Sequence, residues 1–89
     1  MKFEFEFDPA KSASNHAKHG IDFEEIQALR QDPFPLTAPA RTSDEPRWIA
    51  VGQLNGKHWS AIYTIRGKTL RLISARRARK EEIKAYESP

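Results

Sequence analysis

The sequence predicts an α+β fold in which a small, mostly antiparallel sheet carries helices packed on one face. Three observations support this prediction. Phe3, Phe5 and Phe7 alternate with acidic residues, which is typical of a half-buried strand. Asn55-Gly56 and Gly67-Lys68 divide a later region into three strand-like segments. Helix start signals follow the first strand. The expected element order is β-α-α-β-β-β-α.

The length and composition indicate one domain over residues 1–89. A chain of this size buries roughly 60–65% of the surface of its unfolded form, enough for one thin core. Apolar residues make up 38% of the chain and charged residues 30% with a net charge of +3, which favours a folded protein. The absence of cysteine excludes thiol catalysis and disulfides.

The first residues also bear on location. Acidic residues at positions 4, 6 and 8 interrupt any apolar leader core, and apolar runs are too short to span a membrane. We therefore expect a cytoplasmic protein.

The first helix has clear boundaries in the sequence. Asp8-Pro9 supplies an N-cap residue followed by proline at the first helical position. The segment 10–18 is small and polar, which fits a short helix. Gly20 suits the left-handed position that ends it.

A second helix is predicted to follow, with a loop after it. Asp22 and Glu25 form a variant capping box at its start, and Asp32-Pro33 stops it. Residues 34–46 contain three prolines and no apolar period, so we expect a loop there.

Three hairpin-linked strands are predicted next, over 47–54, 57–66 and 69–75. Asn55-Gly56 is a strong two-residue hairpin signal, and Gly67-Lys68 forms a second tight turn. The three strands therefore form an antiparallel meander.

A terminal helix is predicted over 76–87, with Ser74 as its N-cap. Among the strand aromatics, Trp48 and Tyr63 are expected in the core. Whether Trp59 lies in the core is not predicted, because either His58 or Trp59 must face away from the core.

The charge is divided unevenly along the chain. Residues 1–56 contain six Lys/Arg and nine Asp/Glu, whereas residues 57–89 contain nine Lys/Arg and three Asp/Glu. A basic half indicates a polyanionic partner, nucleic acid first. A solvated basic surface explains the charge about equally well.

The cations of this basic half fall into two groups. Arg66 and Arg71 flank the same turn and are expected to lie close together, whereas Arg76 lies about a strand length away. Arginine binds phosphate oxygens bidentately, so a functional role is favoured for Arg66 and Arg76. Three further cations share the terminal helix with two glutamates, and for them a solvated helix surface without a functional role is favoured. They are Arg79, Lys80 and Lys84.

The histidines do not have the spacing of a metal site. His16 and His19 lie three residues apart, but no third ligand has matching spacing, so no metal is expected. His19 with Lys18 is a candidate pair for proton transfer, because imidazole titrates near neutrality. The simpler alternative, a cation stabilising the end of a helix, is favoured by these residues alone.

Several motifs, spread over nearly the whole chain, resemble the BrnT family of toxins. They are Phe7-Asp8-Pro9, Lys11, Asn15, Lys18-His19-Gly20-Ile21, Phe23-Glu24-Glu25, Asp32-Pro33, Arg47, Gly52, Tyr63-Thr64-Ile65-Arg66, Arg71-Leu72-Ile73-Ser74-Ala75-Arg76-Arg77-Ala78, Glu82 and Tyr86. Two positions depart from the family pattern. Phe7 stands where the family often has tryptophan, and Ile83 stands where it often has arginine.

The resemblance implies a toxin of a type II toxin–antitoxin pair with a RelE/ParE-like fold. It implies a ribonuclease that inhibits translation without a metal ion or cofactor. The implied partner is a BrnA-like antitoxin with a ribbon-helix-helix DNA-binding part, and the complex would contact operator DNA through that antitoxin. Two alternatives are a non-catalytic binding module and a ParE-like poison of a protein target.

The resemblance also implies site residues. Arg66 and Arg76 are expected to stabilise the phosphate, with Arg77 as a lesser choice. Lys18 and His19 are the candidates for proton transfer. Glu82 or Tyr86 is expected to assist catalysis from the terminal helix or to hold that helix in place. Additional RNA contacts are expected from the remaining basic and aromatic candidates, namely Lys68, Arg71, Arg77 and Tyr86.

Overall fold

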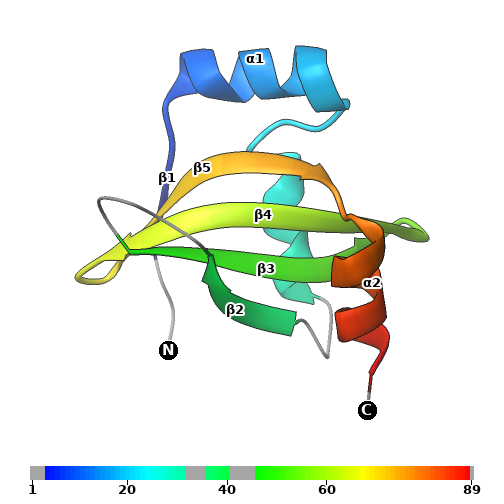
Figure 1. Cartoon of the computed structure of the whole chain (residues 1–89). Coiled ribbons are helices and arrows are strands. Elements are labelled where there is room, and N and C mark those ends of the chain that lie inside the picture. The colour runs from blue at the N-terminus through cyan, green and yellow to red at the C-terminus, as the bar shows by residue number, and fades with distance from the viewer. Residues whose placement is uncertain (1–3, 32–35, 41–45, 89) are drawn as a thin grey trace.

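The computed structural model describes residues 4–31, 36–40 and 46–88 and contains a five-stranded sheet (Figure 1). In chain order the elements are β1 (Glu4–Glu6), α1 (Pro9–His19), the 3₁₀ helix η1 (Glu25–Gln31), β2 (Leu36–Ala40), β3 (Arg47–Leu54), β4 (Lys57–Arg66), β5 (Thr69–Arg77) and α2 (Lys80–Glu87). The strand order is β1-β5-β4-β3-β2. All neighbouring strands are antiparallel except β1 and β5. The predicted α+β class with a mostly antiparallel sheet is therefore confirmed.

The meander and the ends of α1 match the prediction closely. Strands β3 and β4 have the predicted bounds. Asn55 and Gly56 adopt φ values of 53° and 77°, as a type I′ hairpin turn requires. Asp8 caps α1 by accepting a hydrogen bond from the Ala10 amide at 2.9 Å. Gly20 ends the helix at φ 79°.

The predicted loop over 34–46 was wrong in part, because it contains β2. This strand pairs with β3 from Leu36 opposite Val51 to Ala40 opposite Arg47. It lies at the edge of the sheet, which is where a proline such as Pro39 is tolerated in a strand. The prolines therefore obscured an edge strand, and the observed element order differs from the predicted one.

The second and third helices also differ from expectation. The second is a 3₁₀ helix, although the predicted capping box forms: Glu25 N donates to Asp22, and Asp22 N donates to Glu25. Its predicted stop at Asp32-Pro33 lies outside the described residues, as does Phe3 of the first strand. The terminal helix begins at Lys80, because β5 continues to pair with β4 as far as Arg77. Ser74 therefore lies within β5 and is not an N-cap.

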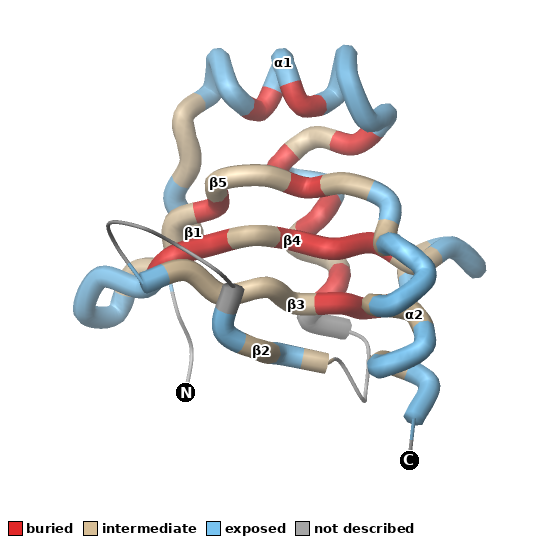
Figure 2. The backbone as a smooth tube through the Cα atoms, in the orientation of Figure 1, coloured by how far each residue is buried: buried red, intermediate tan, exposed pale blue. Residues whose placement is uncertain are grey.

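The core lies on one face of the sheet, where η1 packs (Figure 2). It comprises Ile21, Phe23, Ile26, Leu29, Trp59, Ala61, Tyr63, Leu72 and Ala75. Tyr63 is buried in it and Trp48 packs against it, as predicted, and Trp59 is also buried. No helix in the described ranges is long and apolar enough to cross a membrane.

The helices do not all pack on one face, in contrast to the prediction. Ala61 of β4 contributes to the core under η1, whereas its neighbour Ser60 contacts Glu82 of α2. Successive side chains in a strand point to opposite faces, so η1 and α2 lie on opposite sides of the sheet. Figure 1 shows η1 behind the sheet and α2 in front of it.

Helix α1 is joined to β5 through one buried side chain, Asn15. Its Nδ2 donates to the carbonyls of Ala75 and Ile21, both at 2.8 Å, and its Oδ1 accepts from Ala75 N at 3.2 Å. Within the described residues, strand β1 pairs with β5 only at Thr69, Leu70 and Arg71. The Asn15 amide therefore replaces a neighbouring strand at the part of the β5 edge that β1 does not reach.

Replacing Asn15 with alanine should destabilise the protein by about 3 kcal/mol, because it leaves buried backbone groups of Ala75 and Ile21 without partners. Urea unfolding of the purified chain measures this loss. Ser14→Ala, an exposed change on the same helix, is the control and should shift the unfolding free energy by less than about 0.5 kcal/mol. Equal stability of the two variants would contradict the role of Asn15.

Candidate functional site

The sheet face that carries α2, here called the α2 face, presents polar and cationic side chains in cross-strand rows. On β4 the side chains of Ser60, Ile62 and Thr64 point to this face, opposite Arg76, Ser74 and Arg71 of β5. This face differs from the core face because its β5 positions carry two arginines. Guanidinium groups of this kind bind phosphate oxygens through their N–H donors.

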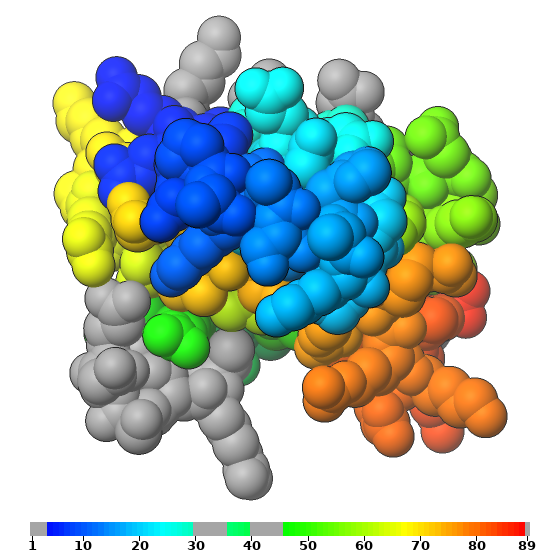
Figure 3. All heavy atoms as spheres, turned by 90° about the horizontal axis from the view of Figure 1, so that it is seen from above, coloured from blue at the N-terminus to red at the C-terminus, as the bar shows by residue number. Residues whose placement is uncertain are grey.

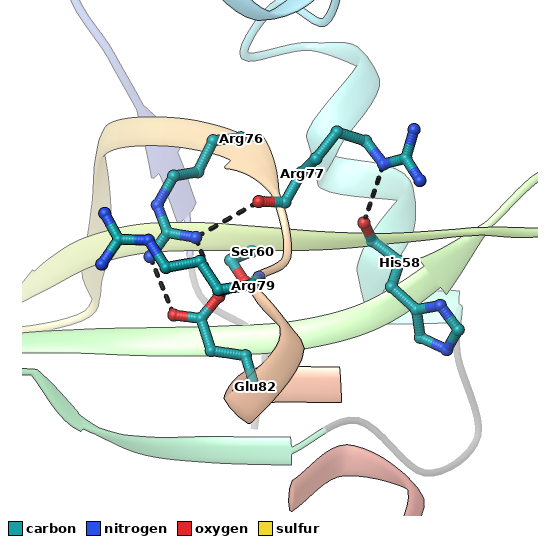
Figure 4. Close-up of polar contacts among 6 residues, drawn as sticks. All are labelled: His58, Ser60, Arg76, Arg77, Arg79 and Glu82. Atoms are coloured by element: carbon teal, nitrogen blue, oxygen red, sulfur yellow. Dashed lines mark hydrogen bonds and ion pairs between the residues drawn. The ribbon is translucent and has the colours of Figure 1, made fainter. Parts of the chain in front are cut away.

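Arg76 is held at one end of the α2 face by a bidentate ion pair with Glu82 (Figure 4). Nη1 and Nη2 each donate to a Glu82 oxygen at 2.8 Å. Oε1 of Glu82 also accepts from Ser60 Oγ at 2.9 Å and from Arg79 N at 2.8 Å. One carboxylate therefore links β4, β5 and the start of α2.

These contacts leave part of the Arg76 guanidinium available. A guanidinium has five N–H donors in a fixed plane. Nη1 uses its two hydrogens on Glu82 and on the Arg77 carbonyl at 3.2 Å, and Nη2 uses one on Glu82. No acceptor among the described residues contacts Nε–H or the second Nη2–H. These two donors form one edge of the guanidinium, which matches two oxygens of a phosphate.

The same contacts change the acidity of Glu82. Its hydrogen bonds with Arg76, opposed by burial and supported by Arg79 N and Ser60, lower the pKa of the carboxyl to about 2. The hydrogen bond with Glu82 raises the pKa of Arg76. Glu82 is therefore ionised and fully engaged at neutral pH, which makes it a poor general base and a good support for Arg76.

Arg77 points away from this network, as Figure 4 shows. Its Nε donates to the His58 carbonyl at 3.3 Å, and its guanidinium lies 5.5 Å from the centre of the Trp59 ring. Trp59 belongs to the core face, so consecutive arginines of β5 serve opposite faces. Arg76 and Arg77 do not converge on one phosphate in this arrangement.

The remaining predicted cations of the meander lie at its other end. Arg66 pairs with Thr69 beside the turn that contains Lys68, whereas Arg76 pairs with Ser60. Six residues along β4 correspond to about 20 Å, so Arg66 and Arg76 cannot contact the same phosphate. Arg71 lies near Arg66, as predicted, and donates to Glu6 at 2.6 Å.

Lys18 and His19 lie at the end of α1 on a hollow of about 180 Å³ between α1 and β5. The other lining residues described are Lys11, Ser14, Asn15, Ile73 and Ser74. Ser74 precedes Arg76 by two residues and shares its face. The fold thus brings the predicted proton-transfer pair to the same sheet edge as Arg76.

Tyr86, in the last turn of α2, packs its ring against His58. The two rings are 5.4 Å apart in an edge-to-face arrangement. His58 Nε2 is buried without a hydrogen bond in the described structure, and Glu87 Oε2 lies 3.7 Å away, beyond hydrogen-bond range. Tyr86 therefore packs α2 onto β4 in this structure.

The sequence analysis missed Ser60, which is fully buried and positions Glu82. A hydroxyl in the middle of a strand next to a core tryptophan is the signal that points to it. The described residues contain no group of three His, Asp or Glu side chains placed to hold a metal ion.

Comparison of the sequence with protein-family models identifies one family. The family model described as ribonuclease toxin, BrnT, of type II toxin–antitoxin system matches residues 7–82. This range extends from the residue before Asp8 to Glu82 and so includes Asn15, Arg76 and the hollow. No curated protein matches the chain.

The ion pair predicts a pH dependence of stability. The pKa of Glu82 is about 2 in the folded state against an ordinary 4.5, so its stabilisation is complete above pH 4.5 and is lost as the pH falls towards 2. Allowing for solvent screening, we expect about 2 kcal/mol at pH 7. Urea unfolding of the parent and Glu82→Gln from pH 7 to pH 2.5 measures it. If the difference in unfolding free energy between the parent and Glu82→Gln stays constant over this range, the lowered pKa of Glu82 is contradicted.

Proposed function

The chain belongs to the BrnT family of ribonuclease toxins of type II toxin–antitoxin systems, and on this premise we propose that it is an endoribonuclease that cleaves RNA without a metal ion. The observation that carries the proposal is Arg76. It is a cation fixed by Glu82 and Ser60 that keeps one guanidinium edge free of described partners.

Metal-free RNA cleavage places three demands on a protein. A base removes the proton from the ribose 2′-OH, whose oxygen attacks the adjacent phosphorus. The bond from phosphorus to the 5′-oxygen then breaks, and an acid gives that oxygen a proton. A cation stabilises the extra negative charge on the phosphorane during the transfer.

Arg76 is proposed to supply that cation. Its position is preorganised, because the Glu82 carboxylate fixes the guanidinium plane and is itself fixed by Ser60 and Arg79 N. Preorganised donors stabilise developing charge without reorganising during the reaction. Glu82 is therefore proposed as a positioning residue. The same carboxylate also links the start of α2 to β4, so Glu82 is proposed to hold that helix in place as well.

Lys18 and His19 are proposed to handle the protons. They lie on the hollow that also includes Ser74, two residues before Arg76 on the same face. Histidine titrates near neutrality and can act as either base or acid. His19 is therefore proposed as the principal proton-transfer residue, with Lys18 beside it.

The other candidates are proposed to act away from the reacting phosphate. Arg66 and Lys68 lie at the far end of β4 and would contact the RNA backbone at a distance. Arg71 is paired with Glu6, and Arg77 lies towards the core face. Tyr86 is proposed to hold α2 in place through His58.

The family implies an antitoxin partner. We propose a BrnA-like antitoxin with a ribbon-helix-helix part, through which the complex would contact operator DNA. The free chain would act in the cytoplasm as a single toxin domain with a RelE-like fold and would inhibit translation by cutting RNA.

Arg76→Ala should lower the rate of RNA cleavage in EDTA by about 10² to 10³, because the phosphorane loses its stabilising cation. Purified parent and variant are incubated with total RNA, and full-length RNA is followed over time. Arg66→Ala should lower the rate by about fivefold or less, in keeping with an exposed phosphate contact.

The adjacent Arg77→Ala is the matched control, since it removes the same charge from the other face. Thermal unfolding checks that each variant is folded. A folded Arg76→Ala chain that cuts RNA as the parent does would refute the proposed centre. Growth arrest by the parent with intact bulk RNA would favour a protein target.

His19→Ala should lower the cleavage rate by about 10² and remove one limb of its pH profile, because a proton-transfer group is lost. The rate is measured from pH 5 to pH 9 for the parent, His19→Ala and His16→Ala. His16 lies one turn earlier on α1 and does not line the hollow, so its variant should keep the profile of the parent. Identical profiles for all three would exclude His19.

A further inference from the structure

We propose that the hollow between α1 and β5 binds a phosphate of the RNA substrate next to the scissile one, with Lys11 as its main cation. This inference rests on the proposed function. It adds a subsite and assigns a role to Lys11, which the catalytic proposal does not use.

The hollow has one wall from α1 and one from β5. Lys11, Ser14 and Lys18 follow one another at helical spacing along α1, and Ile73 and Ser74 line the other side. Seven residues of helix separate Lys11 from Lys18 by about 10 Å. Lys11 and Lys18 therefore lie towards opposite ends of the α1 wall, and each wall carries one serine.

The base of the hollow is rigid. Asn15 lies there, and both hydrogens of its amide and its oxygen are already bonded to backbone groups. Asn15 is therefore not available to a ligand, but it fixes the distance between the two walls. The other α1 residues of the lining, Lys11, Ser14, Lys18 and His19, are exposed.

The chemistry of the lining favours an anion. Among the described lining residues are two lysines, a histidine and two serines, and none carries a carboxylate. The partial negative charge at the end of α1 is offset by Lys18 and His19 in the last turn. A nucleobase would need an apolar or aromatic platform, and Ile73 is the single aliphatic side chain described in this lining.

The hollow adjoins the α2 face, because Ser74 belongs to both. Ser74 and Arg76 are two residues apart on the same face of β5, a separation of about 7 Å. Seen from above α1, the end of this helix lies beside the segment that joins β5 to α2 (Figure 3). An RNA strand whose scissile phosphate contacts Arg76 therefore brings a neighbouring phosphate to the hollow.

Binding of an uncleavable RNA tests the subsite apart from catalysis. A fluorescent single-stranded oligonucleotide with 2′-O-methyl groups lacks the attacking hydroxyl, and its affinity is measured by anisotropy at several salt concentrations. Lys11→Ala should weaken binding about threefold to fivefold and reduce the salt slope by about 0.7, the value for one phosphate contact on a single strand. Lys11→Arg keeps the charge and should restore both quantities.

Lys57→Ala is the matched control, because it removes one exposed lysine at the β3–β4 turn. Equal affinities and slopes for Lys11→Ala and Lys57→Ala would overturn the subsite, and so would a parent chain that does not bind the oligonucleotide at low salt. Cleavage by Arg76→Ala decides the proposed function separately. In the cleavage assay, Lys11→Ala should raise KM relative to Lys57→Ala.

Discussion

The closure of the β5 edge by Asn15 is the interaction on which the arrangement of the site depends. An exposed strand edge has unpaired amides and carbonyls, which must be covered or solvated. In the part of the chain that the structure describes, strand β1 covers β5 from Thr69 to Arg71, and further along β5 the Asn15 side chain of α1 contacts Ala75. Because Asn15 fixes α1 to this point, it also fixes Lys18, His19 and the wall of the hollow relative to the strand that carries Arg76.

The second constraint is electrostatic and lies around Glu82. A partly buried ion pair is costly unless its lone pairs and protons are satisfied, and here one carboxylate accepts from Arg76, Ser60 and Arg79 N. The geometry does more than stabilise α2. Glu82 binds one edge of the Arg76 guanidinium, and no described acceptor contacts the other edge. The contact that anchors the helix therefore also orients the cation that we propose for catalysis.

Local sequence patterns predicted the features that local chemistry determines. The cap at Asp8, the end of α1 at Gly20 and the bounds of β3 and β4 all follow from residues within a few positions of one another. The features that were missed depend on distant partners. Strand β2 exists because it pairs with β3 despite Pro39, and β5 reaches Arg77 because β4 continues beside it. For the site, the arginines were identifiable by type, but the buried Ser60 that supports Glu82 was not.

The basic half of the chain also illustrates why charge alone does not locate a site. Its net charge indicates a polyanionic partner, yet the fold distributes its cations in different directions. Arg71 is paired with Glu6 from the acidic half, and Arg77 stacks on a core tryptophan. Arg66 lies about 20 Å from Arg76 along β4. What distinguishes Arg76 is therefore its partner, because Glu82 holds the guanidinium in place without occupying the donors that a phosphate needs.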